Sequence, residues 1–467
     1  MARFELKSFR GGKSDYTDRG IAGSFLMGKN LDIHGTDDAL TCNQALIADG
    51  NADAIVIDLI LWGINGSDGN FYGFGDSGKI YKRTSSAVWS VVYTDAGGRI
   101  TGAYEWYCDN GKRYMFWATA TTLHAKEMPG NTGWSDVDAT ITPLSAVPQT
   151  YPKSDLTSST WHSMTQSNGD LLICNDKLLA MVGYDGSYTK QAATLRPGTI
   201  ATSIIEKGNV ALIGGGDGQR QSWLLTWSQT GTSISPDAPS WIDKNMIPSP
   251  SINAIVQSEL LLMSAGTNEL YFSDMTNNLP ICTMDGKANP GGVIEKGGLA
   301  LFGLYGGSYP GIWSYGRVRK NESHVLNLEQ YLDATEIGAV WKISEQVFIS
   351  YQKGATHAVR KVDTATKAVA EYYSLTLTAP REAVWQSVDT ITNAIPAGCS
   401  IAIYYDMDNT GSWTQAKMSG DVATATAGQR DPFFLMGSNG RDINLKVVLT
   451  PSGNLTPSIS NLYANFD

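Results

Sequence analysis

Two stretches of twelve residues, IIEKGNVALIGG at 204–215 and VIEKGGLALFGL at 293–304, follow nearly the same pattern. Each contains two apolar residues, a Glu-Lys pair, a turn with glycine and an apolar run. A catalytic loop is normally needed once, whereas a packing motif that cannot bury its apolar face alone has to recur. The duplication therefore predicts a repeat fold, in which the two Glu-Lys pairs are solvated turn charges.

Looser copies of this pattern give the repeat its period. They begin at Trp161 (WHSMTQSNGDLLICN), Ala254 (AIVQSELLLMSA) and Trp341 (WKISEQVFISY), and more weakly at Ile60 and Tyr104. The equivalent apolar positions have a mean spacing of about 47 residues, and they are Trp62, Trp106, Met164, Ile205, Val256, Ile294 and Ile343. A period of roughly 40–50 residues with several short strands is typical of a β-propeller.

The composition supports an all-β fold. Charged residues make up 17% of the 467 residues and 49 are glycine, which favours short strands joined by tight turns over amphipathic helices. The net charge of −10 argues against nucleic acid as a specific partner, because neutralising phosphates needs clustered Lys and Arg. The best basic cluster, Arg317, Arg319 and Lys320, is interpreted as a solvated strand end. DNA could still pass an acidic surface without being held there.

We expect a roughly seven-bladed β-propeller over residues 50–375. The apolar runs VALIG, LALFG and LLLMS predict that the second strand of each blade lies near the axis, with neighbours on both faces. An open ring would leave unpaired strand edges. Residues 1–49 are therefore expected to form an N-terminal arm and, within DALTCNQALIA at 38–48, the strand that closes the ring.

A different pattern begins after the propeller. Alternation of apolar residues in SIAIYYDMD (400–408) and INLKVVLT (443–450) is typical of half-solvated strands. Residues 376–467 are therefore expected to form a C-terminal antiparallel β-sandwich, with the nearly uncharged final stretch as a docked terminal strand.

Two loops rich in Pro, Ser and Thr, at 142–160 and 231–250, interrupt the even spacing. Long irregular loops on a rigid β scaffold are places where contacts with partners concentrate. A plain surface excursion remains an equal alternative for each loop.

The cysteines and the apolar runs bear on the compartment. Five scattered cysteines with no C-x-x-C pair fit neither a disulfide framework nor a zinc site, so we expect reduced thiols and assembly in a cytosol. No signal peptide is visible at the start of the chain. The most apolar run, AIVIDLILWGI at 54–64, is too short to span a bilayer and contains Asp58. It is expected to be a buried strand, and no membrane span is predicted.

A search for catalytic or metal-binding patterns gives no candidate catalytic residue, cofactor or metal site, and we do not expect an enzyme. The five histidines (His34, His124, His162, His324 and His357) have no metal-ligand spacing. In DMDNTGSW (406–413), Asp406 and Asp408 mimic the first ligands of a calcium loop, but Lys417 stands where a bidentate Glu is required. A hairpin turn is favoured, and calcium binding by Asp406 and Asp408 is left open.

A glycan hydrolase is an alternative, because propeller hydrolases use two carboxylates that face each other across a cleft. Acidic residues recur near the expected inner strands, at Glu206, Glu259, Glu295 and Glu345. Charges that recur at one repeat position are interpreted as solvated turn residues.

Both ends of the chain resemble structural proteins of tailed bacteriophages. The segment FRGG (9–12), followed by GKNLD (28–32) just before the first blade, looks like the opening of phage propeller proteins, and LTPSGNLTPSISNLYANF (449–466) looks like the closing strands of the sandwich that follows. Nozzle proteins of short-tailed phages are similar in plan.

The resemblance implies a structural virion protein of the tail, a nozzle, conduit or adaptor that packs in a ring with itself and neighbouring tail proteins. It also implies assembly in the host bacterial cytoplasm and a final location in the virion. An alternative is a tail module that binds a receptor or glycan, motivated by Trp134 and Trp241 in loop-like segments.

Overall fold

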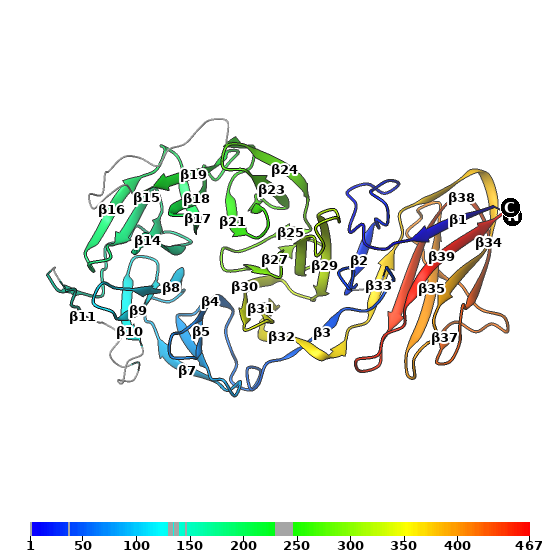
Figure 1. Cartoon of the computed structure of the whole chain (residues 1–467), viewed down its shortest axis with the longest axis horizontal. Helices are drawn as coiled ribbons and strands as arrows, with labels where there is room; N and C mark the ends of the chain where they lie inside the picture. Colours follow the sequence, from blue (N-terminus) through cyan, green and yellow to red (C-terminus); the bar gives the residue numbers. More distant parts are fainter. Residues whose placement is uncertain (1, 36–37, 129–133, 135–139, 145–146, 229–245) are drawn as a thin grey trace.

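The computed structural model describes residues 2–35, 38–128, 134, 140–144, 147–228 and 246–467. These residues form strands β1 to β39 and no helix, which confirms the all-β class. A ring of sheets continues into an elongated C-terminal region, and both chain ends lie at the far end of that region (Figure 1). None of the described residues belongs to a helix that could cross a membrane.

Six blade sheets of the described chain stand as separate sheets. In chain order they are β4 (Ile60–Asn65), β5 (Phe71–Gly75), β6 (Lys79–Arg83) and β7 (Trp89–Thr94); β8 (Gly102–Tyr107), β9 (Arg113–Ala118) and β10 (Leu123–Met128); β13 (Met164–Ser167), β14 (Asp170–Asn175), β15 (Leu178–Val182) and β16 (Tyr188–Thr194); β17 (Ile200–Lys207), β18 (Val210–Gly216), β19 (Ser222–Ser228) and β20 (Met246–Ile247); β21 (Ile252–Gln257), β22 (Leu261–Ala265), β23 (Glu269–Ser273) and β24 (Asn278–Thr283); and β30 (Glu336–Ile343), β31 (Gln346–Lys353) and β32 (Thr356–Lys367) with β3 (Gln44–Ala48).

One further meander lies between β21 and β30 in the ring but belongs to a 14-stranded sheet. It consists of β26 (Val293–Lys296), β27 (Leu299–Gly306), β28 (Gly311–Gly316) and β29 (Val325–Tyr331), with β25 (Gly286–Lys287) beside β27. Its outer strand β29 pairs in parallel with β2 (Met27–Lys29). The count of separate blade sheets is therefore six, where roughly seven blades were expected, because the remaining meander merges with the sheet that leads to the C-terminal region.

The first strand of each sheet lies innermost. Strands β4, β8, β13, β17, β21, β26 and β30 contact one another in succession around the ring, and each carries one of the positions that define the repeat. The second strand of each sheet, expected near the axis, lies next to this innermost strand. The runs in β18, β22 and β27 are apolar because strands flank them on both sides and neighbouring sheets cover both faces.

The two opening stretches form the same turn in two different sheets. In each, the glutamate bonds the backbone three residues ahead: Glu206 Oε1 accepts the N–H of Asn209 at 2.7 Å, and Glu295 Oε1 accepts the N–H of Gly298 at 2.9 Å. Asn209 and Gly298 have φ values of 66° and 87°, which Asn and Gly tolerate. The repetition is thus a structural turn with its own side-chain cap.

A strand from the start of the chain closes the ring. Strand β3 pairs antiparallel with β32, so residues before the first blade and residues after the last one share a sheet. The rest of the N-terminal segment continues to the C-terminal region, where β1 (Ala2–Lys7) pairs with the last strand, β39 (Ile459–Phe466).

Long strands build the C-terminal region around one core. Its strands are β33 (Ala370–Tyr373), β34 (Leu377–Thr392), β35 (Ser400–Met407), β36 (Thr414–Gln415), β37 (Ala425–Thr426), β38 (Phe433–Thr450) and β39. The first part of β38 pairs with β34, and its last part pairs with β33 and β35. The alternating apolar residues of the stretches 400–408 and 443–450 are buried in this core, as predicted: Ile401, Ile403, Tyr405, Ile443, Leu445, Val447 and Leu449. The expected boundary at 375/376 falls between β33 and β34, yet β33 already pairs with β38.

Two local expectations are corrected. In the run 54–64, only the part from Ile60 onward is a strand, and Val56 is 78% exposed in a turn with φ 51°. In the loop 142–160, the side chain of Tyr151 is buried, and Lys153 exchanges two backbone hydrogen bonds with Leu123, adding an outer position to the β8–β10 sheet. Within this loop, β12 (Gln149–Thr150) pairs with β11 (Thr140–Ile141), which directly precedes the loop. Most of the loop 231–250 lies outside the described residues.

Candidate functional site

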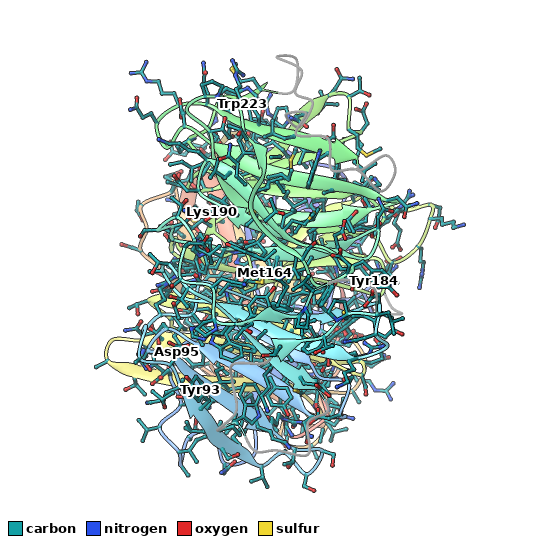
Figure 2. The ribbon with its side chains drawn as sticks, turned by 90° about the vertical axis from the view of Figure 1, so that its left-hand side faces the viewer. Tyr93, Asp95, Met164, Tyr184, Lys190 and Trp223 are labelled. Carbon is teal, nitrogen blue, oxygen red and sulfur yellow. The ribbon has the colours of Figure 1, made fainter. Side chains whose placement is uncertain are left out.

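The two ends of the propeller carry different loops. The turn face carries the turns between first and second strands, such as 208–209 and 297–298, and the turn 183–187 between β15 and β16. The connection face carries the links from one sheet to the next, such as 95–101 and 195–199. Figure 2 views the ring edge-on, with Asp95 toward one face and Tyr184 toward the other.

Aspartates on the connection face join neighbouring sheets at several links. Asp95, directly after β7, accepts a hydrogen bond from the indole N–H of Trp117 at 2.9 Å, and His124 Nε2 lies 3.2 Å from the same oxygen. Asp49, after β3, accepts from Trp89 Nε1 at 2.8 Å and from Arg83 Nε at 2.5 Å. These buried carboxylates join neighbouring sheets and are not available to a ligand.

Asp285 repeats this arrangement in the meander that belongs to the large sheet. It follows β24 and accepts the backbone N–H groups of Ser308 and Tyr309. In all three places the aspartate ends an outer strand and precedes Gly or Ala, as in ADG (48–50), TDA (94–96) and MDG (284–286). This second repeated motif is visible in the sequence but lies outside the pattern of the inner strands.

A cavity of about 420 Å³ opens on the connection face, between the sheets that begin with β13 and β17. It is lined by hydroxyl groups, one indole and one carboxylate, from Ser158, Thr160, Trp161, Asp176, Ile200 and Thr202. Pockets that bind small molecules combine an apolar surface with a few polar groups in this way. The cavity is the candidate functional site.

One wall of the cavity is held by a buried neutral histidine. His162 Nε2 donates to the carbonyl of Thr157 at 3.0 Å, and its Nδ1 lies 2.8 Å from the hydroxyl of Thr101. Burial lowers the pKa of His162 to about 4, so the ring is neutral at physiological pH. Asn175 Oδ1 accepts the N–H of Thr157 at 2.7 Å, which fixes the segment 157–162 from a second side.

Trp161 places its half-buried indole between the cavity and the centre of the ring. Its ring packs edge-to-face on Trp62, with 6.0 Å between the centroids. The guanidinium of Arg99 lies 4.7 Å above the Trp161 ring, a cation–π contact. Within the described chain the Nε of Arg99 and the indole N–H of Trp62 have no hydrogen-bond partner.

Asp176 supplies the carboxylate of the cavity. It follows β14 with φ 59°, a conformation that Asp tolerates in a tight turn, and its backbone carbonyl accepts the N–H of Ala201 at 2.9 Å. Its carboxylate accepts no hydrogen bond from any described residue and faces the cavity without an ion pair. By contrast Asp217, in the corresponding turn of the next sheet, accepts three backbone N–H groups.

A second buried polar group lies where the propeller meets the C-terminal region. We call His34, Asn43, Ser314, Asn327 and Glu329 the junction cluster. Glu329 accepts from Asn43 at 2.5 Å, from Ser314 at 2.6 Å and from Asn327 at 2.9 Å, and His34 Nε2 lies 3.4 Å away. Burial acts to raise the pKa of Glu329, but these donors, His34 first, outweigh burial and hold it below its usual range.

Of the two tryptophans proposed for glycan binding, Trp134 and Trp241, the structure describes only Trp134. Trp134 is not a free surface residue, because its ring packs on Tyr72 and Trp117 with centroids 5.3 Å and 5.9 Å away. Trp241 lies outside the described residues.

The calcium-like segment forms a hydrogen-bonded turn. The two carboxylate oxygens of Asp406 accept the N–H groups of Thr410 and Gly411, and Asp408 Oδ1 accepts those of Arg441 and Asp442 at 3.0 Å. Lys417 pairs with Asp421 at 2.8 Å. The carboxylates of Asp406 and Asp408 thus serve different backbone segments.

The acidic positions proposed for a hydrolase lie on the turn face with local partners. Glu206 and Glu295 cap their own turns, and Glu345 is exposed in a turn. Glu259 binds Arg317 through both guanidinium ends and lies 3.2 Å from His324. The bond from Arg317 lowers the pKa of Glu259 to about 2. Arg317 directly follows β28 and forms this ion pair at the surface, beside the exposed Arg319 and Lys320.

The remaining chemistry-bearing residues are dispersed. Within the described residues, no three side chains of His, Cys, Asp or Glu gather closely enough to hold a metal ion. The cysteines are free thiols, and all but the half-buried Cys282 are buried: Cys42, Cys108, Cys174 and Cys399.

No protein-family model and no curated protein matches the chain. The chain is similar in structure to the WD40 β-propeller domain of Doa1, with a TM-score of 0.46 and 13% identity over 69% of this chain and 98% of that one. It is also similar to the β-propeller domain of Cps50 (Swd1) from Myceliophteria thermophila, with a TM-score of 0.45 and 9% identity over 66% and 98% of the two chains. BamB from Moraxella catarrhalis gives a TM-score of 0.38 and 12% identity over 69% and 98%.

Proposed function

We propose that the chain is a structural component of a phage virion, a tail protein acting as nozzle, conduit or adaptor and assembling as a ring with itself and with neighbouring tail proteins. In this proposal it has no catalytic role, and DNA passes its acidic surface without specific binding. Its final location is the virion, after assembly in the host cytoplasm.

The observation that carries the proposal is the continuous 14-stranded sheet. It runs from β25 in the propeller, through β29, β2 and β33, to β1 at the far end of the C-terminal region. Backbone hydrogen bonds thus cross the boundary between the two parts, and the buried junction cluster reinforces it. A hinge there would break these bonds, so the two parts are suited to holding neighbours in a fixed orientation.

Mass spectrometry of purified phage particles tests the proposal, with the chain expected among the virion proteins at a constant copy number. Two-dimensional class averages of the purified protein are expected to show rings. Absence from the particle would contradict the virion assignment, whereas a monomer in solution alone would contradict only self-assembly.

A second candidate function is recognition of a glycan, favoured by the cavity that combines Trp161 with the free carboxylate of Asp176. A glycan array probed with the full chain tests it. We expect binding that weakens in Trp161→Ala, and an array without binding would count against this function.

A further inference from the structure

We propose that the cavity beside Trp161 binds one neutral sugar residue, with the indole as its apolar platform and Asp176 as acceptor for its hydroxyl groups. This inference rests on the second candidate function and names its site and its ligand class. A volume of about 420 Å³ lies within the roughly 300–1,000 Å³ usual for ligand pockets and accommodates a single pyranose ring.

The indole provides the surface that a sugar needs. A pyranose presents C–H groups on its faces and hydroxyl groups at its rim, and an aromatic ring packs against the C–H groups. Trp161 lines the cavity and is held by the T-shaped contact with Trp62. The Arg99 guanidinium covers one face of the Trp161 ring. The rest of the indole surface is then available to a ligand in the cavity.

Asp176 provides the directional contacts. An ionised carboxylate has two oxygens that only accept, so it can take hydrogen bonds from two neighbouring hydroxyl groups of one sugar. In the described chain no residue donates to these oxygens, whereas Oδ1 of Asp217 in the equivalent turn accepts three backbone N–H groups. The exposed hydroxyl groups of Ser158 and Thr160 lie on the same lining and can donate or accept.

Charge selects a neutral ligand. The lining contains a carboxylate and no Lys or Arg, so an acidic sugar would bring a second negative charge against Asp176. A cationic ligand stacked on the indole would meet the field of Arg99, 4.7 Å from the same ring. A polyol with no net charge avoids both costs.

The wall is organised before any ligand binds. Neutral His162 and Asn175 both bind Thr157, and the hydroxyl of Ser159 donates to the carbonyl of Trp161 at 3.1 Å. A site with fixed side chains loses less conformational entropy on binding, which favours affinity for a small ligand.

The test titrates the full chain with glucose, galactose, mannose and N-acetylglucosamine, each followed by calorimetry. We expect at least one sugar to bind with a dissociation constant in the millimolar range. Trp161→Ala and Asp176→Asn are each expected to weaken that binding at least tenfold. Trp413→Ala and Asp421→Asn are the matched controls, because both residues lie in the C-terminal region, and Asp421, like Asp176, has positive φ.

The alternatives give different results. Saturation by none of the four sugars, sugar affinity in both site variants equal to that of the unsubstituted protein, or tighter binding of glucuronate or tetramethylammonium than of the neutral sugars would each overturn the assignment. Asp176→Asn preserves the turn, so it decides the question if Trp161→Ala fails to fold. Array binding that survives both variants would reject this cavity and leave the glycan-binding function standing.

Discussion

The sheet of β17–β20 and the meander of β26–β29 contain nearly the same twelve residues, yet their outer edges differ. Both form the same turn, capped by Glu206 in one and by Glu295 in the other. The first sheet ends in the two-residue strand β20. In the meander, the outer edge of β29 pairs with β2, which links it to the C-terminal region. The local pattern determines the inner half of a blade, and the outer half depends on which strand is available to pair with it.

The largest expected effect comes from the junction cluster, which only the joined meander has. Glu329→Ala removes a buried acceptor, which leaves the Asn43 side-chain donor without its acceptor and His34 without its ion-pair partner. Loss of one member of such a buried group costs about 3–5 kcal/mol. Urea unfolding followed by circular dichroism measures the free energy of unfolding, with Glu295→Ala as the exposed control. Equal values for the two variants would contradict the structural importance of the junction.

The second-largest effect is expected in the pH dependence of the free energy of unfolding, through His162. The folded pKa of His162 is about 4 against 6.5 unfolded, so the unfolded chain binds more protons between these values. The contribution of His162 to stability is therefore expected to fall by up to about 3 kcal/mol as pH drops through that window, and to be constant above it. His162→Gln is expected to remove this slope in urea unfolding measured from pH 4 to 7.

The His34–Glu329 pair is expected to give the opposite pH dependence of stability. Burial alone would lower its pKa, but Glu329 outweighs burial and raises it. The stability from this pair is complete below the unfolded pKa of histidine and is lost as pH rises through the raised folded value. His34→Gln should therefore lose more stability at pH 6 than at pH 9, and a loss independent of pH would show that the pair is not charged.

A smaller effect is expected at the aspartates of the connection face. Asp95→Ala and Asp285→Ala each leave backbone or indole donors unsatisfied, at a cost of about 1–3 kcal/mol. Similar losses in the two variants would indicate that a separate sheet and the joined meander are fastened alike. Thermal unfolding compared with Asp421→Ala, whose side chain is 81% exposed, provides the measurement.

The smallest effect is expected at the two glutamate caps. Glu206→Ala and Glu295→Ala each remove one turn hydrogen bond, exposed in the first and half-buried in the second, worth about 0.5–1 kcal/mol. Glu295 also lies 3.7 Å from Lys342, and exposed ion pairs add little. Urea unfolding is expected to give values within about 0.5 kcal/mol of each other. A larger difference would mean that the joined meander strains its turn.

The inner strands were predictable because their apolar residues recur with the turn that follows them. The positions Trp62 to Ile343 all fall on the innermost strands, and the apolar alternation in β35 and β38 identified their buried sides. The merging of β29 with the C-terminal sheet was not predictable, because β2 has three residues and pairs with segments about 300 residues away. The cavity was missed for a similar reason: Trp161 and Asp176 carry no motif, and only the ring brings their turns together.

Strand β1 runs antiparallel beside β39, with Ala2 opposite Phe466 and Lys7 opposite Asn461. The two chain ends therefore leave the molecule at the same end of one strand pair. A pulling force applied between the termini loads the backbone hydrogen bonds one after another, as in opening a zipper, and does not load them together. This pair is therefore the mechanically weak point under such a load, and β1 separates from the sheet before any propeller strand bears the force.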